Sequence, residues 1–452
     1  MARLVVRQGC AVLDRHVDRK LAKFSCTSTA PSSTVESAVG RAVESLRERT
    51  QEGPKLEDFL QSAKANMRAS KNGVLETAKR GQAVPPTLPM EAMSELAAHL
   101  SKADVMKGRA TRESVPSTQV SSMLTDSHGR FHNYLRISLT ERCNLRCVYC
   151  MPESGIDLQP QTKMLTRDEI VRLATMFVHA GVDKIRLTGG EPLIRKDLRD
   201  IVASLSSLSG VRNVGITTNG INLSKKLPAL KEAGLTHINV SLDTLRPDRF
   251  GAITRRKGLD AVLGSLEAAL ELGFGGRLKV NCVVMKGVNT DELSDFLTLT
   301  KNQELDIRFI EWMPFDDNRW NDNKFVSYQD MLDLIRVRYP DLERSSDSAN
   351  DTTKWHRVPG NKGRVGFITS MSHNFCGTCN RLRITADGNL KVCLFGDESL
   401  SLRDAIRGGL SDVETSTLIK AAVLGKHAVL GGHGDMYGIA GAKNRPMTTI
   451  GG

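Results

Sequence analysis

The sequence predicts an α/β protein built around a partial (β/α)6 barrel of the TIM type. From residue 131 onward, short apolar runs alternate with longer helical stretches, which is the pattern of β/α units and a parallel sheet. Six such units can be distinguished, fewer than a closed eight-fold barrel needs. Clustered cysteines and short distinctive motifs follow the ends of the strands, where the loops of a parallel barrel converge. We therefore expect an open barrel over residues 131–325 and a C-terminal α+β extension over residues 326–452.

The first 130 residues are expected to lie outside the barrel. Residues 1–30 contain six Arg and Lys, only two Asp and no Glu. This bias is typical of an organellar transit peptide and predicts delivery to the mitochondrial matrix, with the plastid as the alternative. A basic disordered tail is the other interpretation. Residues 31–130 alternate short amphipathic pieces with polar linkers, so we expect loosely held helices or disorder there.

Six strands are expected in the barrel, each followed by a distinctive loop. Their ranges are 134–139, 184–188, 213–218, 237–242, 278–285 and 306–313, and helical stretches such as 167–181, 224–234 and 259–273 separate them. The first strand runs into a loop with three cysteines, and the second, third, fourth and sixth end in TGGEP, TTNG, SLD and EWMP. Right-handed parallel topology brings these loops together at one end of the barrel.

The C-terminal extension begins with a helical pattern from residue 328 to about residue 345, followed by a polar stretch. Strands are expected near 364–370 and within 381–395, the latter as a hairpin that turns at Asp387-Gly388. The chain ends in a glycine-rich segment, 431–452.

Composition and charge narrow the class of ligand. The chain is 40% apolar and 25% charged, as is ordinary for a globular protein, and no eighteen-residue apolar run suggests a membrane span. Its net charge of +12 would attract nucleic acid, an anionic surface or an anionic small substrate. Aromatic residues make up only 5%, and no basic run is interleaved with stacking rings. A small phosphorylated ligand is therefore favoured over nucleic acid.

The first of two cysteine groups suggests an iron–sulfur cluster. Cys143, Cys147 and Cys150 are spaced C-x3-C-x2-C, with no fourth cysteine or histidine nearby. A structural zinc site usually takes four protein ligands. Three thiolates instead suit a [4Fe-4S] cluster in which one iron stays open to a small molecule.

The second group repeats the three-thiol pattern in the extension. Cys376, Cys379 and Cys393 are spaced C-x2-C-x13-C, and a second cluster with one open iron is the economical interpretation. A zinc site completed by His373 is the alternative.

The C-x3-C-x-aromatic-C pattern resembles the radical S-adenosylmethionine (SAM) enzymes. In that family the open iron binds the amino and carboxylate groups of SAM, and one electron cleaves the S–C bond to give a 5′-deoxyadenosyl radical. TGGEP at residues 188–192 also matches the family. The resemblance implies SAM contacts from Tyr149, Gly190, Ser241 and Met313, although a strand-end Ser is also a common cap and a Met a common core residue.

Within that superfamily, CNRLRITADG followed by CLF, RFIEWMP and the terminal Gly-Gly resemble the GTP 3′,8-cyclases of molybdenum cofactor synthesis. The resemblance covers about residues 130–452 and implies that the radical removes hydrogen from C3′ of GTP before C3′ attacks guanine C8. It also implies that guanine leans on the second cluster, and that Gly451 and Gly452 reach into the site and are needed for turnover.

GTP carries about four negative charges, so its site should be lined with cations, and Arg grips phosphate oxygens in pairs. Lys184 and Arg186, and likewise Arg381 and Arg383, are spaced i, i+2 on strands, which aims both members of each pair the same way. The resemblance implies GTP contacts from Arg136, Lys184, Arg186, Thr217, Lys279, Arg308, Arg381 and Arg383, with Thr218 as an alternative to Thr217.

The resemblance further implies an electron donor, a cyclic pyranopterin monophosphate synthase that acts next, and a homodimer. Two alternatives stay open from the residues alone. One is a peptide-modifying radical SAM enzyme with two clusters, although such extensions generally carry more cysteines. The other is a basic zinc protein that binds nucleic acid.

Overall fold

The computed structural model describes residues 122–451, apart from 317, 319 and 348–349. The expected transit peptide, the linker up to residue 121 and Gly452 lie outside the described residues. Within them, no helix has the length and apolar character needed to cross a membrane.

The predicted strands are present and form one continuous parallel array. Their bounds are β1 Tyr134–Ser138, β2 Lys184–Thr188, β3 Asn213–Thr218, β4 His237–Ser241, β5 Leu278–Val284 and β6 Leu305–Glu311. Each agrees with its expected range to within two residues, because the apolar runs are short and end at polar or glycine-containing loops. The six strands pair in sequence order and in parallel.

The C-terminal extension continues this sheet at both edges. Strand β9 (Val365–Ile368) pairs in parallel with β6, and β10 (Arg381–Ile384) pairs in parallel with β1. The array thus has eight parallel strands, and its two end strands, β9 and β10, do not pair with each other, so the barrel is open. The remaining strands are antiparallel: β7 Glu343–Arg344, β8 Thr353–Arg357, β11 Asn389–Lys391 and β12 Leu400–Ser401. The expected hairpin at Asp387-Gly388 joins β10 to β11, with Gly388 at φ 82°.

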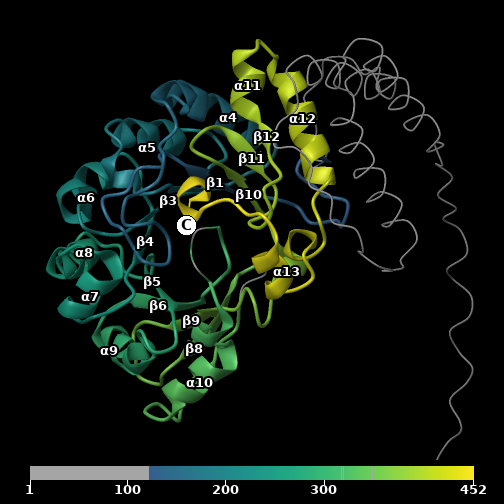
Figure 1. Cartoon of the computed structure of the whole chain (residues 1–452). Coiled ribbons are helices and arrows are strands. Elements are labelled where there is room, and N and C mark those ends of the chain that lie inside the picture. The colour runs from purple at the N-terminus through teal and green to yellow at the C-terminus, as the bar shows by residue number, and fades with distance from the viewer. Residues whose placement is uncertain (1–121, 317, 319, 348–349, 452) are drawn as a thin grey trace, which may run out of the picture.

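Helices cover the outer face of the strands (Figure 1). They are α4 Arg167–His179, α5 Leu198–Ser206, α6 Leu223–Glu232, α7 Pro247–Thr254, α8 Leu259–Glu271, α9 Leu293–Asn302 and α10 Tyr328–Arg336. Helix α4 illustrates the local signals: Thr166 and Glu169 form a capping box, and Ile170, Leu173 and Phe177 are buried on one face. The extension adds α11 Leu402–Arg407, α12 Asp412–Leu424, α13 Met436–Gly441 and α14 Met447–Ile450. Short 3-10 helices are η2 Gln161–Lys163, η3 Pro192–Ile194, η4 Thr290–Glu292, η5 Asp322–Lys324, η6 Cys376–Thr378 and η7 Leu430–Gly432.

Strand alternation separates the apolar core from the polar interior of the barrel. Leu135 and Ile137 of β1, with Ile185 and Leu187 of β2, belong to the main core between sheet and helices. The residues between them point to the opposite, inner face. On that face the strands carry basic and hydroxyl side chains instead of the branched apolar ones that fill a closed barrel.

Candidate active site

The first cysteine group lies in the loop after β1, at the carboxyl end of the parallel strands. Cys143, Cys147 and Cys150 are free and half-buried. This loop is tied to the loop after β2, where Gly190 N donates to Thr140 O at 2.6 Å. On its other side, the backbone of the loop is hydrogen-bonded to the last turn of α7. The protein itself thus holds the loop on both sides.

Gly190 allows the two loops to approach each other closely. A Cβ at this position would lie 2.3 Å from Arg142 O and 2.6 Å from Glu141 O, much closer than real side chains come. The sequence suggested Gly190 as a SAM contact. That contact stays a prediction, and the structure adds a separate reason for the glycine, namely room for the backbone of the cysteine loop.

Tyr149 anchors the cysteine loop through a buried carboxylate. Its phenol donates to Asp243 Oδ2 at 2.7 Å, and Val283 N donates to the other carboxylate oxygen at 2.8 Å. Burial raises the pKa of Asp243 to about 6. Because the Tyr149 hydroxyl donates its proton to Asp243, it could contact SAM only as a hydrogen-bond acceptor, and the ring and backbone of Tyr149 are the other groups that could make the predicted contact.

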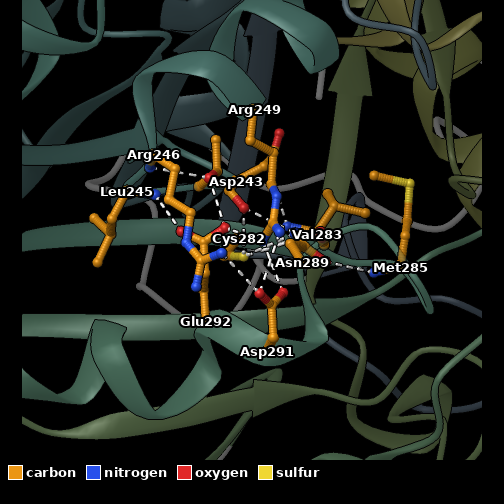
Figure 2. Close-up of polar contacts among 11 residues, drawn as sticks. Asp243, Leu245, Arg246, Arg249, Cys282, Val283, Met285, Asn289, Asp291 and Glu292 are labelled. Atoms are coloured by element: carbon orange, nitrogen blue, oxygen red, sulfur yellow. Dashed lines mark hydrogen bonds and ion pairs between the residues drawn. The ribbon is translucent and has the colours of Figure 1, made fainter.

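Asn289 and Glu292 extend this network between the ends of β4 and β5, as Figure 2 shows. Asn289 Nδ2 donates to Asp243 O at 2.8 Å and to Val283 O at 2.9 Å. Glu292 accepts a hydrogen bond from Leu245 N at 2.6 Å, and both Asn289 and Glu292 are fully buried. Ser241, the predicted SAM residue at the end of β4, lines a cavity of about 30 Å³ together with Cys147 and Tyr149. Sequence analysis missed the network, although the SLD motif contains its central carboxylate.

Without a metal, burial holds the thiols of the first group in their neutral form. Burial, and then the charge of Cys143, raise the pKa of Cys150 to about 12, and burial also raises the pKa of Cys147. Leu145 N donates to Cys143 Sγ at 3.4 Å. Three mutually repelling thiolates need a strongly cationic partner, which iron supplies when it displaces their protons.

Predicted phosphate-binding residues form rows across the inner face. Arg383 of β10, Arg136 of β1 and Arg186 of β2 are in register on three adjacent strands. The preceding row consists of Arg381, Tyr134 and Lys184. Gly215 of β3, next in register to Arg186, leaves space for that guanidinium, whose Cζ would lie 3.0 Å from a Cβ there.

These cations are held close together at an energetic cost. Burial and the charge of Arg381 lower the pKa of Arg383 to about 10, and burial and Arg186 do the same to Arg308. Burial and the charge of Arg383 also lower the pKa of Arg136. Arg383 Nη1 is buried and has no hydrogen-bond partner among the described residues. An anion bound here would relieve both the repulsion and the unsatisfied donor.

Lys279 and Arg308 lie on the far side of the barrel and already have polar partners. Lys279 Nζ is 3.3 Å from Asp306 Oδ2, and Arg364 Nη2 is 2.7 Å from the same oxygen. Arg308 Nε donates to Asn281 Oδ1 at 2.9 Å. The predicted phosphate-binding residues therefore differ in how far their charge is balanced. The row on β10, β1 and β2 is dominated by cations, whereas the charge of Lys279 is partly neutralised by Asp306.

Thr217 and Thr218 have different environments. Thr218 Oγ1 donates to Glu191 Oε1 at 2.7 Å, while Glu191 Oε2 accepts from Asn219 N at 2.7 Å. Thr217 Oγ1 is buried without a hydrogen-bond partner among the described residues. Thr218 is thus engaged in joining the loops after β2 and β3, and Thr217 is the better candidate for a ligand contact. Glu191, buried in the TGGEP motif, is a residue that sequence analysis did not single out.

The second cysteine group lies at the amino end of β10. Cys376 begins η6 and Cys379 precedes β10, while the hairpin returns Cys393 to the same end. Burial, and then the charges of Cys393 and Cys379, raise the pKa of Cys376. Cys393 Sγ would lie 3.4 Å from a Cβ on Gly431, the residue next to Leu430. Leu430 N donates to Cys376 Sγ at 3.4 Å.

A buried lysine contacts the second group. Lys426 is 3% exposed, and its Nζ lies 3.4 Å from Cys379 Sγ and 2.8 Å from His132 Nε2. Burial alone would raise the pKa of Cys379, but the charges of Lys426 and Arg381 lower it to about 7. Lysine so near a thiol favours the thiolate that a metal requires. Lys426 lies far from Cys376 and Cys379 in the sequence, so the spacing of the cysteines did not reveal this contact.

Residues 122–130, which the sequence placed in the linker, pack against this second group. Arg130 Nη1 donates to Cys376 O at 2.8 Å, and Nη2 donates to His427 O at 2.8 Å. The guanidinium is held by Asp126 at 2.6 Å. The segment before β1 thus holds two parts of the extension together around the cysteines.

The C-terminal tail lies between the two cysteine groups. Met447 of α14 packs in one apolar cluster with Cys147 and Cys150, and in another with Cys376 and Met313. A Cβ on Gly451 would lie 2.0 Å from Thr188 Oγ1, so the tail touches the end of β2. Figure 1 shows this end of the chain within the ring of strands and helices. Met313, a predicted SAM contact, packs beside the tail.

The geometry of the described residues lends no support to a zinc site completed by His373. Its ring lies edge-on to Tyr328 at 5.9 Å, and within the described residues no three His, Cys, Asp or Glu side chains surround one point as ligands of a single metal ion. This finding concerns single ions, because a cube of four irons takes its thiolates at separate corners.

Comparison with known proteins agrees with the geometry of both halves. Residues 137–300 match the Radical SAM superfamily, and residues 305–430 match the family described as Molybdenum Cofactor Synthesis C. The chain is 53% identical over 340 residues to "GTP 3′,8-cyclase, mitochondrial" of Arabidopsis thaliana, covering 75% of this chain and 86% of that protein. It is 44% identical over 306 residues to "GTP 3′,8-cyclase" of Listeria welshimeri, covering 67% of this chain and 90% of that protein. The chain belongs to the GTP 3′,8-cyclase family of radical SAM enzymes.

The chain also matches parts of longer proteins. The chain is 58% identical over 330 residues to "Molybdenum cofactor biosynthesis protein 1" of Bos taurus, covering 73% of this chain and 52% of that protein. The chain thus spans about half the length of its animal relatives. Membership of the superfamily implies SAM and one iron–sulfur cluster, and the C-x3-C-x2-C loop fits that cluster in its donor set and burial.

Proposed function

We propose that this chain is a GTP 3′,8-cyclase, which converts GTP to (8S)-3′,8-cyclo-7,8-dihydroguanosine 5′-triphosphate in the first step of molybdenum cofactor synthesis. The observation that carries the proposal is the placement of the cations. Cys379 precedes β10 and Cys143 follows β1, and these strands are parallel, so the rows of inner cations lie between the two thiol groups. A polyanionic nucleotide bound there would have one thiol group at each end.

The inner cations would bind the triphosphate and orient the ribose. Arg136, Arg186, Arg381 and Arg383 supply planar donors suited to paired phosphate oxygens, and Thr217 supplies a buried hydroxyl. Lys184, Lys279 and Arg308 are predicted to complete the contacts. Fixing both ends of the substrate would position one ribose carbon, which is how an enzyme limits the reactions open to a radical.

The protein would hold two cofactor groups around this substrate. When bound, the first cluster and SAM supply the 5′-deoxyadenosyl radical that removes hydrogen from C3′. Cys143, Cys147 and Cys150 would hold that cluster, with Gly190, Ser241 and Met313 near SAM. Cys376, Cys379 and Cys393 would hold a second [4Fe-4S] cluster whose open iron faces guanine. The terminal glycines and Met447 would close the site and exclude water.

The wider setting is proposed with the reaction. We infer an external one-electron donor, a cyclic pyranopterin monophosphate synthase as the next enzyme, a homodimer, and the mitochondrial matrix as the location. The name of the Arabidopsis relative supports the location.

Anaerobic incubation of the iron-loaded chain with GTP, SAM and dithionite tests the proposal. We expect 5′-deoxyadenosine and a cyclised guanosine triphosphate in matched amounts, and about eight irons per chain. Cys393→Ala should lose about half of the iron, whereas Cys282→Ala, which alters a buried cysteine outside both groups, should keep all of it. Cleavage of SAM without any GTP product would contradict the assignment of substrate, and two zincs without sulfide would contradict the clusters.

A further inference from the structure

Tyr134, which is not among the predicted site residues, occupies the centre of the cation rows. It is the first residue of β1 and is in register with Arg381 on one side and Lys184 on the other. Arg186 Nε donates to its phenol oxygen at 2.6 Å, and the Arg381 guanidinium lies 5.7 Å from its ring centroid. A phenol in this place faces basic groups from both neighbouring strands.

The surroundings of the phenol oxygen favour its anion. Burial alone would raise the pKa of Tyr134, but the charges of Arg186, Arg136 and Arg381 outweigh burial and lower it to about 7. In turn, the phenolate charge raises the pKa values of Arg308 and Arg383 against their burial. Among the described residues, no carboxylate forms an ion pair with Arg186, Arg381 or Arg383. Tyr134 is therefore one counter-charge of this part of the barrel, beside Cys379, which raises the pKa of Arg383 more strongly, and Asp351, which raises the pKa of Arg308.

A triphosphate entering the same site would replace that counter-charge. Phenolate and phosphate cannot share the arginines without repelling each other, whereas a neutral phenol can donate a hydrogen bond to a phosphate oxygen. We propose that Tyr134 is a substrate-binding residue that balances the arginines in the free protein and takes up a proton when the triphosphate of GTP binds. This inference rests on the proposed function, because it takes GTP as the ligand.

The pH dependence of GTP affinity tests the inference. Above pH 7 the free site would hold a phenolate that must be protonated on binding, so affinity should fall by about tenfold per pH unit until the raised pKa of the complex is reached. Tyr134→Phe should lose this slope. The variant should bind GTP more weakly than the wild type at pH 6.5, because a hydrogen bond is missing, and at least as tightly at pH 9.

The measurement is calorimetric titration of the iron-loaded chain with GTP in buffers of different ionisation enthalpy at pH 8. We expect uptake of about one proton per GTP by the wild type and by Tyr339→Phe, and none by Tyr134→Phe. Tyr339 is a suitable control because, among the residues that the structure describes, its hydroxyl is hydrogen-bonded only to Ser294 O, at 3.5 Å, outside the inner face. Equal slopes and equal proton uptake in Tyr134→Phe and wild type would overturn the inference while leaving GTP binding intact. Absence of GTP binding by the wild type would overturn the proposed function as well.

Discussion

Gly190→Ala tests the close approach of the cysteine loop to the loop after β2. The added Cβ would lie 2.3 Å from Arg142 O and 2.6 Å from Glu141 O, and neither backbone atom can move by a change of rotamer. The φ angle of Gly190 is not in the left-handed region, so the cost is steric and not conformational. Overpacking of this kind costs about 1–3 kcal/mol, and relief requires the loop carrying Cys143 to shift.

Two measurements follow from this geometry. The free energy of unfolding of the iron-free chain in urea should fall by about 1–3 kcal/mol. The reconstituted chain should retain about half of its iron, because the first group loses its alignment and the second, at the other end of β1 and β10, is untouched.

Gly264→Ala is the matched control, since its Cβ would meet nothing within 4 Å in α8. It should keep all of the iron and gain up to about 1 kcal/mol of stability from improved helix propensity. Full iron content and unchanged stability in Gly190→Ala would refute the close approach.

Four further variants probe the site. Asp243 has its pKa raised from 3.8 to about 6, so between pH 4 and 6 the folded chain holds a proton that the unfolded chain has released, and stability falls by up to about 3 kcal/mol as the pH rises. Asp243→Asn should flatten this slope in urea unfolding of the iron-free chain, and an unchanged slope would contradict the assignment. Arg383→Met should stabilise the ligand-free chain by about 1–3 kcal/mol and weaken GTP binding about 10–100-fold, measured by urea unfolding and calorimetry. Lys426→Met should raise the pKa of the neighbouring thiol and lower iron content towards one cluster per chain; undiminished iron would show that the lysine is not needed. Deletion of Gly451 and Gly452 should abolish cyclisation at constant iron content, and full activity would exclude a role for the tail.

Local patterns in the sequence account for the strands, the cysteine groups and the inner cations. Apolar runs bounded by polar loops located the first six strands of the parallel array, since side chains alternate faces in any strand. The same alternation predicts that Arg381 and Arg383 share one face of β10. Each cysteine group offers three thiols for the four irons of a [4Fe-4S] cluster. The number of thiols in a group can be read from the local sequence, so the sequence alone suggested clusters with one open iron.

Contacts between distant segments could be found only in the tertiary structure. Lys426 reaches Cys379 across 47 residues, and Tyr149 reaches Asp243 across 94. Both interactions depend on how βα loops and the extension pack, and no periodicity encodes that packing. The placement of β9 and β10 at opposite ends of the parallel array is of the same kind, because it depends on strand pairing.

The order of residues along the chain specifies which side chains are available for the chemistry: six clustered thiols and a set of strand arginines. Packing in three dimensions establishes which of them are already satisfied. Thr218 and Lys279 have protein partners, whereas Thr217 Oγ1 and Arg383 Nη1 have none among the described residues, and the Tyr134 hydroxyl accepts a hydrogen bond from Arg186. Hydrogen bonding and charge balance depend on separation in space, and strand pairing sets that separation.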